Sequence, residues 1–279
     1  MGNELIAHVL SSAANRRAKV LLVGDSSLSY DAIIRVPGQG DEEGKFIVKV
    51  KEDAERVSRD VITDLIVLSK VSNSTPLIVG VRYGDEEMID GVAYKMHGIY
   101  AVSIRTFKRI LDNDGVKFVK DKGMIKASVK GQLLRKLRES RGMSLGDLAK
   151  ALGVTRRTIY EYERGSIEAS ERTARILVEL FNENILNDVD LKPNDEEVRR
   201  DIESREGLVN EDIKRLLPSF RLYSLLKAHT KIAAHSGSES YLVEDRGRVN
   251  NEVVNVARVL GVGLVVIEPD KNDVEFLES

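Results

Sequence analysis

Cysteine and tryptophan are absent from this sequence of 279 residues. Without cysteine, the chain has no disulfide, no thiol nucleophile and no zinc site built on thiolates. It also has no run near the roughly 18 apolar residues that a membrane-spanning helix requires. No basic cluster precedes an apolar core at the amino terminus, which argues against a secretory signal. We therefore expect a cytoplasmic protein without membrane association.

Motifs for cofactor chemistry are missing as well. The four histidines have no spacing that would bring them to one metal, and the phosphate-binding pattern GxxxxGK(S/T) does not occur. Gly38, Gly40 and Gly44 approach the pattern GxGxxG, but their spacing is one residue too long and a strand-like run follows where a helix is needed. We predict no catalytic residue, no bound metal and no cofactor.

The charge of the chain is unevenly distributed. Its formal net charge is −2, with 42% hydrophobic and 32% charged residues, a composition typical of a globular protein. Residues 126–181 nevertheless carry a net charge of +5, so the rest of the chain carries −7. Electrostatic attraction is screened beyond about 8 Å at physiological salt. A local positive region can therefore favour nucleic acid although the whole chain is acidic.

Residues 1–118 alternate helical and strand patterns. Apolar residues at helical spacing predict a helix over 5–13 and a long amphipathic helix over 54–69, and a further helix is expected over 105–111. Short apolar runs predict strands at 19–23, 31–36, 45–50, 77–81 and 99–102. This order predicts an α/β domain, a mixed sheet flanked by helices.

Two further segments complete the predicted organisation. Residues 126–182 read as an all-α domain, and the polar residues 183–210 as a charged linker or a solvated helix. Residues 211–279 return to α/β patterning and predict a small third domain. Part of it resembles the first: residues 56–68 align with 248–260, each followed by a strand-like run, and residues 19–23 resemble 231–234. We interpret it as a shortened copy without the hairpin of 31–36 and 45–50, with coincidence as the alternative.

The strongest signal is the stretch 131–165, GQLLRKLRESRGMSLGDLAKALGVTRRTIYEYERG. It predicts three short helices. The first ends at Gly142, where glycine supplies the left-handed residue that terminates a helix. Ser144 and Asp147 have the spacing of a capping box at the start of the second helix, with Asp in place of the usual Glu or Gln.

A third helix is predicted after the turn that Gly153 permits. Thr155 can cap it, and Ile159 and Tyr162 point inward. Its outer face then carries Arg156, Arg157, Tyr160 and Arg164. Arginine makes paired hydrogen bonds to guanine, and one good pair discriminates between bases by about 1–3 kcal/mol. The predicted DNA-binding set is completed by Ser144, Thr155 and the candidate phosphate contacts Lys126, Lys130 and Lys150.

This stretch resembles the helix-turn-helix of Cro and the phage repressors, also called the xenobiotic-response-element family. The matching residues are Leu137, Arg141, Gly142, Ser144, Leu148, Ala149, Leu152, Gly153, Val154, Thr155, Ile159, Glu163, Arg164 and Gly165. The resemblance implies a five-helix domain in which 145–164 form the two-helix motif and 155–163 the recognition helix. Many relatives have Gln where this chain has Leu145, so one phosphate contact of that family is not expected here.

Two wider resemblances follow. In the order of its parts, and in the segments SLGDLAKALGVTRRTIYEYERG and PLIVGVRYGDEEMIDGVAYKMHGIYAVSIRTF, the chain is similar to an archaeal family of helix-turn-helix transcriptional regulators. The first segment resembles the Holliday-junction-resolvase and restriction-endonuclease fold, which holds metal with an Asp at a strand start and an acid two residues before a Lys. Asp31 fits, and Glu4 could add an acid, but Ile47 stands two residues before Lys49.

We interpret the first domain as a nuclease-like scaffold without nuclease chemistry, with Asp31 as a strand-end charge and Lys49 as solvent-facing. Such a scaffold could support dimerisation, or it could bind a metabolite or a second protein. The leading hypothesis is a homodimeric transcription factor that reads an inverted repeat in double-stranded DNA. The alternatives are a metal-dependent DNA nuclease that the helix-turn-helix targets, and an antitoxin-like module that binds a partner protein.

Overall fold

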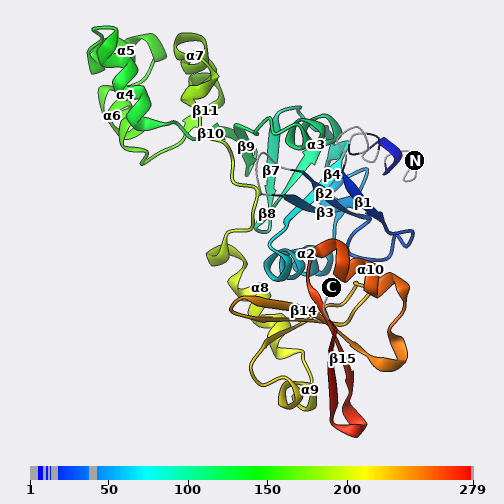
Figure 1. The fold of residues 1–279 in the computed structure, drawn as a ribbon. Helices are drawn as coiled ribbons and strands as arrows, with labels where there is room; N and C mark the ends of the chain where they lie inside the picture. Colours follow the sequence, from blue (N-terminus) through cyan, green and yellow to red (C-terminus); the bar gives the residue numbers. More distant parts are fainter. Residues whose placement is uncertain (1–5, 9–10, 12, 14–17, 38–42, 278–279) are drawn as a thin grey trace.

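The computed structural model describes every residue except 1–5, 9–10, 12, 14–17, 38–42 and 278–279. Of the first predicted helix, over 5–13, residues 6–8, 11 and 13 are described and are helical, whereas residues 5, 9–10 and 12 and also Glu4 lie outside the described part of the chain. Two sheets enclose a layer of helices, and a separate group of helices stands to one side (Figure 1). Among the helices of the described residues, none has the length and apolar character needed to cross a bilayer.

The first sheet has nine strands in the order β1-β2-β3-β4-β8-β7-β9-β10-β11. The strands are β1 Lys19–Leu22, β2 Ala32–Val36, β3 Gly44–Val50, β4 Thr75–Gly80, β7 Val92–Met96, β8 Ile99–Ser103, β9 Phe118–Asp121, β10 Met124–Ala127 and β11 Ala169–Ser170. A small hairpin, β5 Arg82–Tyr83 with β6 Glu86–Glu87, lies apart from it. Parallel pairs β3–β4 and β4–β8 occur beside antiparallel ones, so the sheet is mixed as predicted.

Helices cover both faces of the first sheet. Alternate residues of β2 point to opposite sides, so Ile34 packs beneath α3 Ile104–Leu111 while Ile33 faces α2 Arg59–Ser72. The long helix was predicted over 54–69; in the structure, Ala54–Arg56 form a 3-10 helix, η1, and α2 begins only at Arg59. Asp53, whose side chain accepts a hydrogen bond from the Glu55 amide, caps that first turn.

The second sheet has five strands in the order β12-β13-β14-β15-β16. Its strands are β12 Arg221–Ser224, β13 Ile232–Ser236, β14 Glu239–Asp245, β15 Gly263–Glu268 and β16 Asp273–Leu277, with α9 Glu211–Leu216, η3 Arg246–Arg248, α10 Asn251–Leu260 and η4 Pro269–Lys271 between or beside them. β14 and β15 are parallel, and the other neighbours are antiparallel.

Both sheets contain the same unit. The first repeat, β1-β2-β3-η1-α2-β4, and the second repeat, β12-β13-β14-η3-α10-β15, share the order of elements and the direction of every strand pair. Asp53 and Asp245 each cap the 3-10 helix with their carboxylates. The helices end at left-handed residues, Asn73 in the first repeat and Gly261 in the second. The structure thus contains an internal duplication of this unit.

Two details of the expected repeat were wrong. The second repeat is not shortened by a hairpin: β13 and β14 form it, and the turn at Gly237 and Ser238 is so short that the sequence seemed to leave no room. Gly237 adopts a φ of 59°, which a turn between adjacent antiparallel strands requires. The counterpart of β1 is β12, and the segment 231–234 that resembled it belongs largely to β13 instead.

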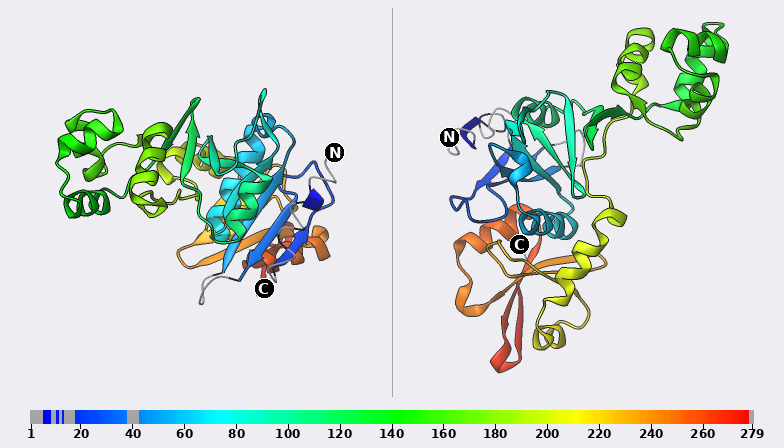
Figure 2. Two further views of the ribbon diagram at one scale, coloured as in Figure 1. Left: turned by 90° about the horizontal axis from the view of Figure 1, so that it is seen from above. Right: turned by 180° about the vertical axis from the view of Figure 1, so that it is seen from behind.

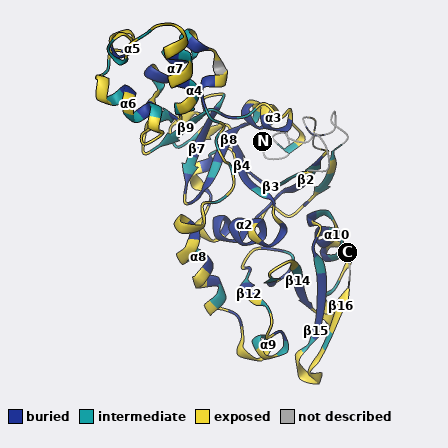
Figure 3. Cartoon of the chain, turned by 60° about the vertical axis from the view of Figure 1, so that its left-hand side comes forward, coloured by how far each residue is buried: buried dark blue, intermediate teal, exposed yellow. Residues whose placement is uncertain are grey.

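The two repeats pack through their helices. α2 lies against β13 and β14 of the second repeat, and α10 lies against β1 and β2 of the first. One apolar core therefore joins both sheets and both helices, and it contains Ile47, Leu65, Tyr223, Leu242, Val256 and Leu264. The second repeat covers the outer side of α2, so this helix is buried almost all around (Figure 3). The prediction of an amphipathic helix was therefore wrong.

Asp64 on α2 is the polar centre of this interface, and its side chain is fully buried. It accepts hydrogen bonds from the Ser29 hydroxyl at 2.7 Å and from the Lys227 amide at 2.7 Å. The amide of Leu226 donates at 3.1 Å, and the Arg205 guanidinium lies 3.3 Å away. One carboxylate therefore connects three segments of the chain.

The charged stretch 183–210 contains more than a linker. It begins with η2 Glu183–Ile185 and includes α8 Asp195–Gly207, which packs on α2 and β12. Val198, Ile202 and Arg205 are buried, and Arg59 makes a bidentate ion pair with Asp201. The solvated-helix alternative thus holds for the outer side of α8 only. Its inner side binds it to the body of the protein.

The helical region, residues 131–185, stands out from the two sheets (Figure 2). Its helices are α4 Gly131–Ser140, α5 Leu145–Leu152, α6 Arg156–Arg164 and α7 Glu171–Phe181. The first sheet continues into it, because β9 pairs with β10 and β10 pairs with β11. The chain leaves beside its point of entry, where the Asn187 amide donates to the Ser128 carbonyl at 2.9 Å. Hydrogen bonds therefore hold the region to the first sheet.

Candidate nucleic-acid interface

Local sequence sets the ends of the three predicted helices, and the structure confirms these signals. Gly142, Gly153 and Gly165 adopt φ values of 65°, 66° and 68°, the left-handed conformation that follows the end of a helix. Thr155 caps α6 by accepting a hydrogen bond from the Thr158 amide at 3.1 Å. The recognition helix predicted for 155–163 is therefore α6 with Thr155 as its cap.

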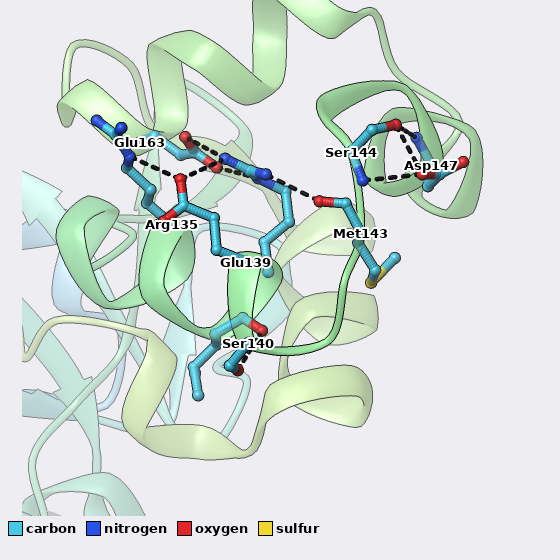
Figure 4. Close-up of polar contacts among 9 residues, drawn as sticks. Arg135, Glu139, Ser140, Met143, Ser144, Asp147 and Glu163 are labelled. Carbon is cyan, nitrogen blue, oxygen red and sulfur yellow. Dashed lines mark hydrogen bonds and ion pairs between the residues drawn. The ribbon is translucent and has the colours of Figure 1, made fainter.

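A capping box opens α5, as predicted (Figure 4). The Ser144 hydroxyl accepts from the Asp147 amide at 3.1 Å, and the Asp147 carboxylate accepts from the Ser144 amide at 2.8 Å. The Ser144 hydroxyl also donates to the Asp147 carboxylate at 2.6 Å, and this bond, followed by the one from the Ser144 amide, lowers the pKa of Asp147. The hydroxyls of Ser144 and Thr155 thus position the two helices of the motif.

α6 has one side that is buried in the helical region and one side that is exposed to solvent. Ile159 and Tyr162 are buried in the core of the helical region. The predicted outer residues Arg156, Arg157, Tyr160 and Arg164 are all exposed. The Arg164 guanidinium lies 5.6 Å from the centre of the Tyr160 ring, so these two side chains stack. α6 therefore presents three guanidinium groups and one aromatic ring to solvent.

A buried ion pair that the sequence analysis missed links α4 to the end of α6. Arg138 donates to Glu163 through Nε at 2.6 Å and through Nη2 at 3.1 Å, and to the Met143 carbonyl at 2.9 Å (Figure 4). Both side chains are less than a tenth exposed. A two-pronged bond of this kind fixes orientation as well as distance. The signal was the pair of opposite charges on two helices that must pack together.

Gly131 is a second residue whose role the sequence did not reveal. A Cβ at this position would lie 2.3 Å from the Glu163 carbonyl oxygen and 2.5 Å from that of Tyr162. Glycine therefore lets the start of α4 approach the end of α6 backbone to backbone. The predicted phosphate contact Lys130 precedes it and is half-buried.

The other two predicted phosphate contacts lie on different elements. Lys150 is exposed on α5, which packs directly against α6. Lys126 is half-buried on β10, where it pairs with Ser170 at the junction with the first sheet. Lys150 is thus on the helix beside α6, whereas Lys126 belongs to the stem.

The nuclease-like pair forms a buried contact in the first repeat: Asp31 directly precedes β2 as the predicted strand-end charge, but the prediction of a solvent-facing Lys49 was wrong. Lys49 donates to Asp31 at 3.2 Å and to the carbonyls of Ser26 and Leu28 at 3.1 and 2.7 Å. Asp31 also accepts from the Val50 amide at 2.6 Å, and both charged side chains are buried. The Asp31 carboxylate and the loop before β2 therefore surround the Lys49 ammonium.

The position that would carry the second acid of a nuclease points into the core. Ile47 is fully buried among the apolar side chains between the repeats. It has no oxygen to offer a cation, and no group of three or more His, Cys, Asp or Glu residues that could hold a metal occurs in the described part of the chain. The residues present do not fit a metal ion at this site.

Comparison with protein families agrees with this geometry. The PD-(D/E)XK superfamily domain matches residues 3–116, and the Helix-turn-helix family matches residues 134–186. The first match covers most of the first sheet, and the second covers most of the helical region. The protein therefore joins an α/β domain of PD-(D/E)XK type to a helix-turn-helix domain. No solved structure matches the chain.

Similar proteins match this chain over most of their length. A protein from Pyrobaculum aerophilum, named "Putative HTH-type transcriptional regulatory protein", is 28% identical over 94% of this chain and 98% of its own. Proteins of the same name from Thermococcus gammatolerans and Methanoculleus marisnigri are 31% and 32% identical, over 82% and 76% of this chain and 76% and 71% of theirs. The chain belongs to this family of HTH-type transcriptional regulatory proteins.

Proposed function

We propose that the protein is a sequence-specific DNA-binding transcriptional regulator that reads double-stranded DNA with α6. The observation that carries the proposal is the pair Arg156 and Arg157, both exposed in the first turn of a helix whose other side is anchored by Ile159 and Tyr162. A helix of this kind fits the major groove, and its first turn approaches the base edges. The local charge of +5 and the family membership support the same assignment.

Around this helix, Ser144, Thr155, Tyr160, Arg164, Lys126, Lys130 and Lys150 complete the proposed contact set. The lysines supply phosphate contacts, which position the domain but carry no sequence information. We also propose that the domains comprise residues 1–118, 126–182 and 211–279, and that residues 183–210 form a connection that includes α8. A cytoplasmic location follows from the proposed role.

Reading an inverted repeat would require two chains, and we propose a homodimer on half-sites about one helical turn apart. The α2 side of the first repeat is covered by the second repeat of the same chain. A homodimer must therefore use another surface.

The proposal is tested by selecting duplexes from a random pool with the full chain, then measuring affinity for the selected duplex at moderate salt. Replacing Arg156 or Arg157 with Ala should weaken binding about tenfold, because a bidentate contact to a base is lost. The melting temperature should stay unchanged, since both side chains are exposed. Arg200→Ala, on the exposed side of α8, is the matched control. Recovery of no preferred sequence would rule out the function itself.

We further propose that the nuclease-like domain does not cleave DNA. Support comes from Ile47 at the position of the second acid and from the ion pair that engages Asp31. Linear and branched DNA should remain intact with Mg²⁺ or Mn²⁺. Cleavage that requires metal and disappears in Asp31→Ala would contradict the proposal and favour the nuclease alternative.

A further inference from the structure

Gly146, in the first turn of α5, lies directly beneath the side chain of Arg156. A Cβ built on Gly146 would lie 2.8 Å from Nε of Arg156, 3.0 Å from Nη2 and 3.2 Å from Cζ. Cβ atoms essentially never approach other atoms more closely than 3.0 Å. The guanidinium therefore occupies the space that any other residue at 146 would fill with its side chain.

The backbone at Gly146 does not require glycine. Its φ is not positive, unlike that of Gly142 or Gly153, and it lies within a regular helix. Within a helix, glycine is less stable than alanine by up to about 1 kcal/mol. Local stability thus favours alanine at this position, whereas the contact with Arg156 favours glycine.

The Arg156 guanidinium is otherwise free for a ligand. Within the part of the chain that the structure describes, it makes no hydrogen bond or ion pair, so its donors are available. Asp147, the next residue of α5, is close enough for Arg156 to contribute to its lowered pKa, after the larger contribution of the Ser144 hydrogen bonds. The guanidinium consequently lies over the start of α5, in space that glycine leaves open and near the Asp147 carboxylate.

We propose that Gly146 is a positioning residue that sets where Arg156 meets DNA and thereby contributes to sequence preference. The inference rests on the proposed DNA-binding function. A methyl group at 146 displaces the guanidinium from the surface of α5, so the arginine remains present but approaches DNA from a different position. The effect of residue 146 on DNA binding must therefore disappear when residue 156 has no guanidinium.

The test is a double-mutant cycle in the full chain with Gly146→Ala, Arg156→Ala and the double variant. The probes are the selected duplex and a duplex of unrelated sequence. Gly146→Ala should weaken binding to the selected duplex by about three- to tenfold and relax the preference at one base position, with little change for the unrelated duplex. In the Arg156→Ala background the same substitution should change affinity less than twofold.

A matched control is Gly207→Ala, the same substitution at a helical glycine where a Cβ would meet nothing within 4 Å. Its affinity should equal that of the unmodified protein. Thermal melting should show Gly146→Ala to be at least as stable as the parent, so that a loss of binding cannot be assigned to unfolding.

Three outcomes would overturn the proposal. An equal loss from Gly146→Ala with and without the Arg156 guanidinium would mean that Gly146 acts through another contact. Unchanged binding of Gly146→Ala, with weakened binding of Arg156→Ala, would show that the arginine needs no positioning while leaving the proposed function intact. Unchanged binding of both single variants would remove Arg156 from the interface and contradict the proposed contact face as well.

Discussion

The two repeats have the same topology but opposite polar chemistry. In the first sheet, Ala32 pairs with Val48; in the second, Ile232 pairs with Val243. The neighbours of these residues, Asp31 and Lys49 in the first repeat, therefore correspond to Lys231 and Glu244 in the second. The acid and the base have exchanged places.

The consequences of that exchange differ between the repeats. Asp31 and Lys49 are both buried and form an ion pair, whereas Lys231 is exposed, Glu244 is buried, and these two described residues form no ion pair. Burial raises the pKa of Glu244. What the two copies share is the apolar packing of α2 and α10. The apolar packing is therefore common to both repeats, whereas the buried ion pair occurs in the first repeat but not between the corresponding residues of the second.

The largest effect should come from removing the polar centre of the interface. Asp64→Ala removes the buried carboxylate beside Arg205 and leaves three donors, the Ser29 hydroxyl and the amides of Leu226 and Lys227, without this acceptor. We expect a loss of about 3–5 kcal/mol in the free energy of unfolding, measured in urea. Asp60→Ala is the control, because Asp60 also contacts Arg205 but is exposed. It should cost below about 1 kcal/mol; equal losses would refute the central role of Asp64.

An intermediate effect should separate the two exchanged pairs. Lys49→Met removes an ammonium that bridges Asp31 and two carbonyls, whereas Asp31 keeps its bond from the Val50 amide. We expect a loss of about 2–3 kcal/mol, against below about 0.5 kcal/mol for Lys231→Met, because Lys231 is exposed. If the two substitutions cost the same in urea unfolding, the contrast between the repeats is wrong.

The smallest effect concerns a contact across the repeats, where the Tyr30 hydroxyl lies 2.8 Å from Nδ1 of His229. Burial lowers the pKa of His229 below its ordinary 6.5. The unfolded chain therefore binds this proton more readily, and stability falls as the pH drops below about 6.5, by on the order of 1 kcal/mol or less.

Unfolding in urea at pH 7.5 and pH 5.5 measures this dependence. His229→Asn should remove part of it. If the parent protein were more stable at pH 5.5 than at pH 7.5, and His229→Asn reduced this gain, the predicted sign for His229 would be wrong.

The helix-turn-helix could be predicted in detail because its signals are local. Ser144 caps α5 through a residue only three positions away, Gly153 allows the turn that follows, and Thr155 caps α6. No distant segment of the chain is needed for these signals. Strands β1, β2, β3, β4 and β8 of the first sheet followed from short apolar runs for the same reason, whereas β7, β9, β10 and β11 were not predicted. The buried pair Arg138 and Glu163 joins positions 25 residues apart, which no local pattern specifies.

Long-range packing explains the remaining differences. The outer side of α2 is apolar because it packs against the second repeat, which is distant in the sequence. The role of Asp64 depends on Arg205, which is also distant in the sequence. For α8 a signal was present: Val198, Ile202 and Arg205 recur at helical spacing within a charged stretch. Its partner surface on α2 could not be known from the sequence.

The strand pairing that carries the first sheet into the helical region has a mechanical consequence. β10 binds β11, which immediately precedes α7, so bending at this junction would break backbone hydrogen bonds. The axis of a duplex bound by α6 would therefore have a fixed orientation relative to the two sheets. Each inserted base pair turns a duplex by about 35°, so two such stiff arms on one operator would accept only spacers of matching helical phase.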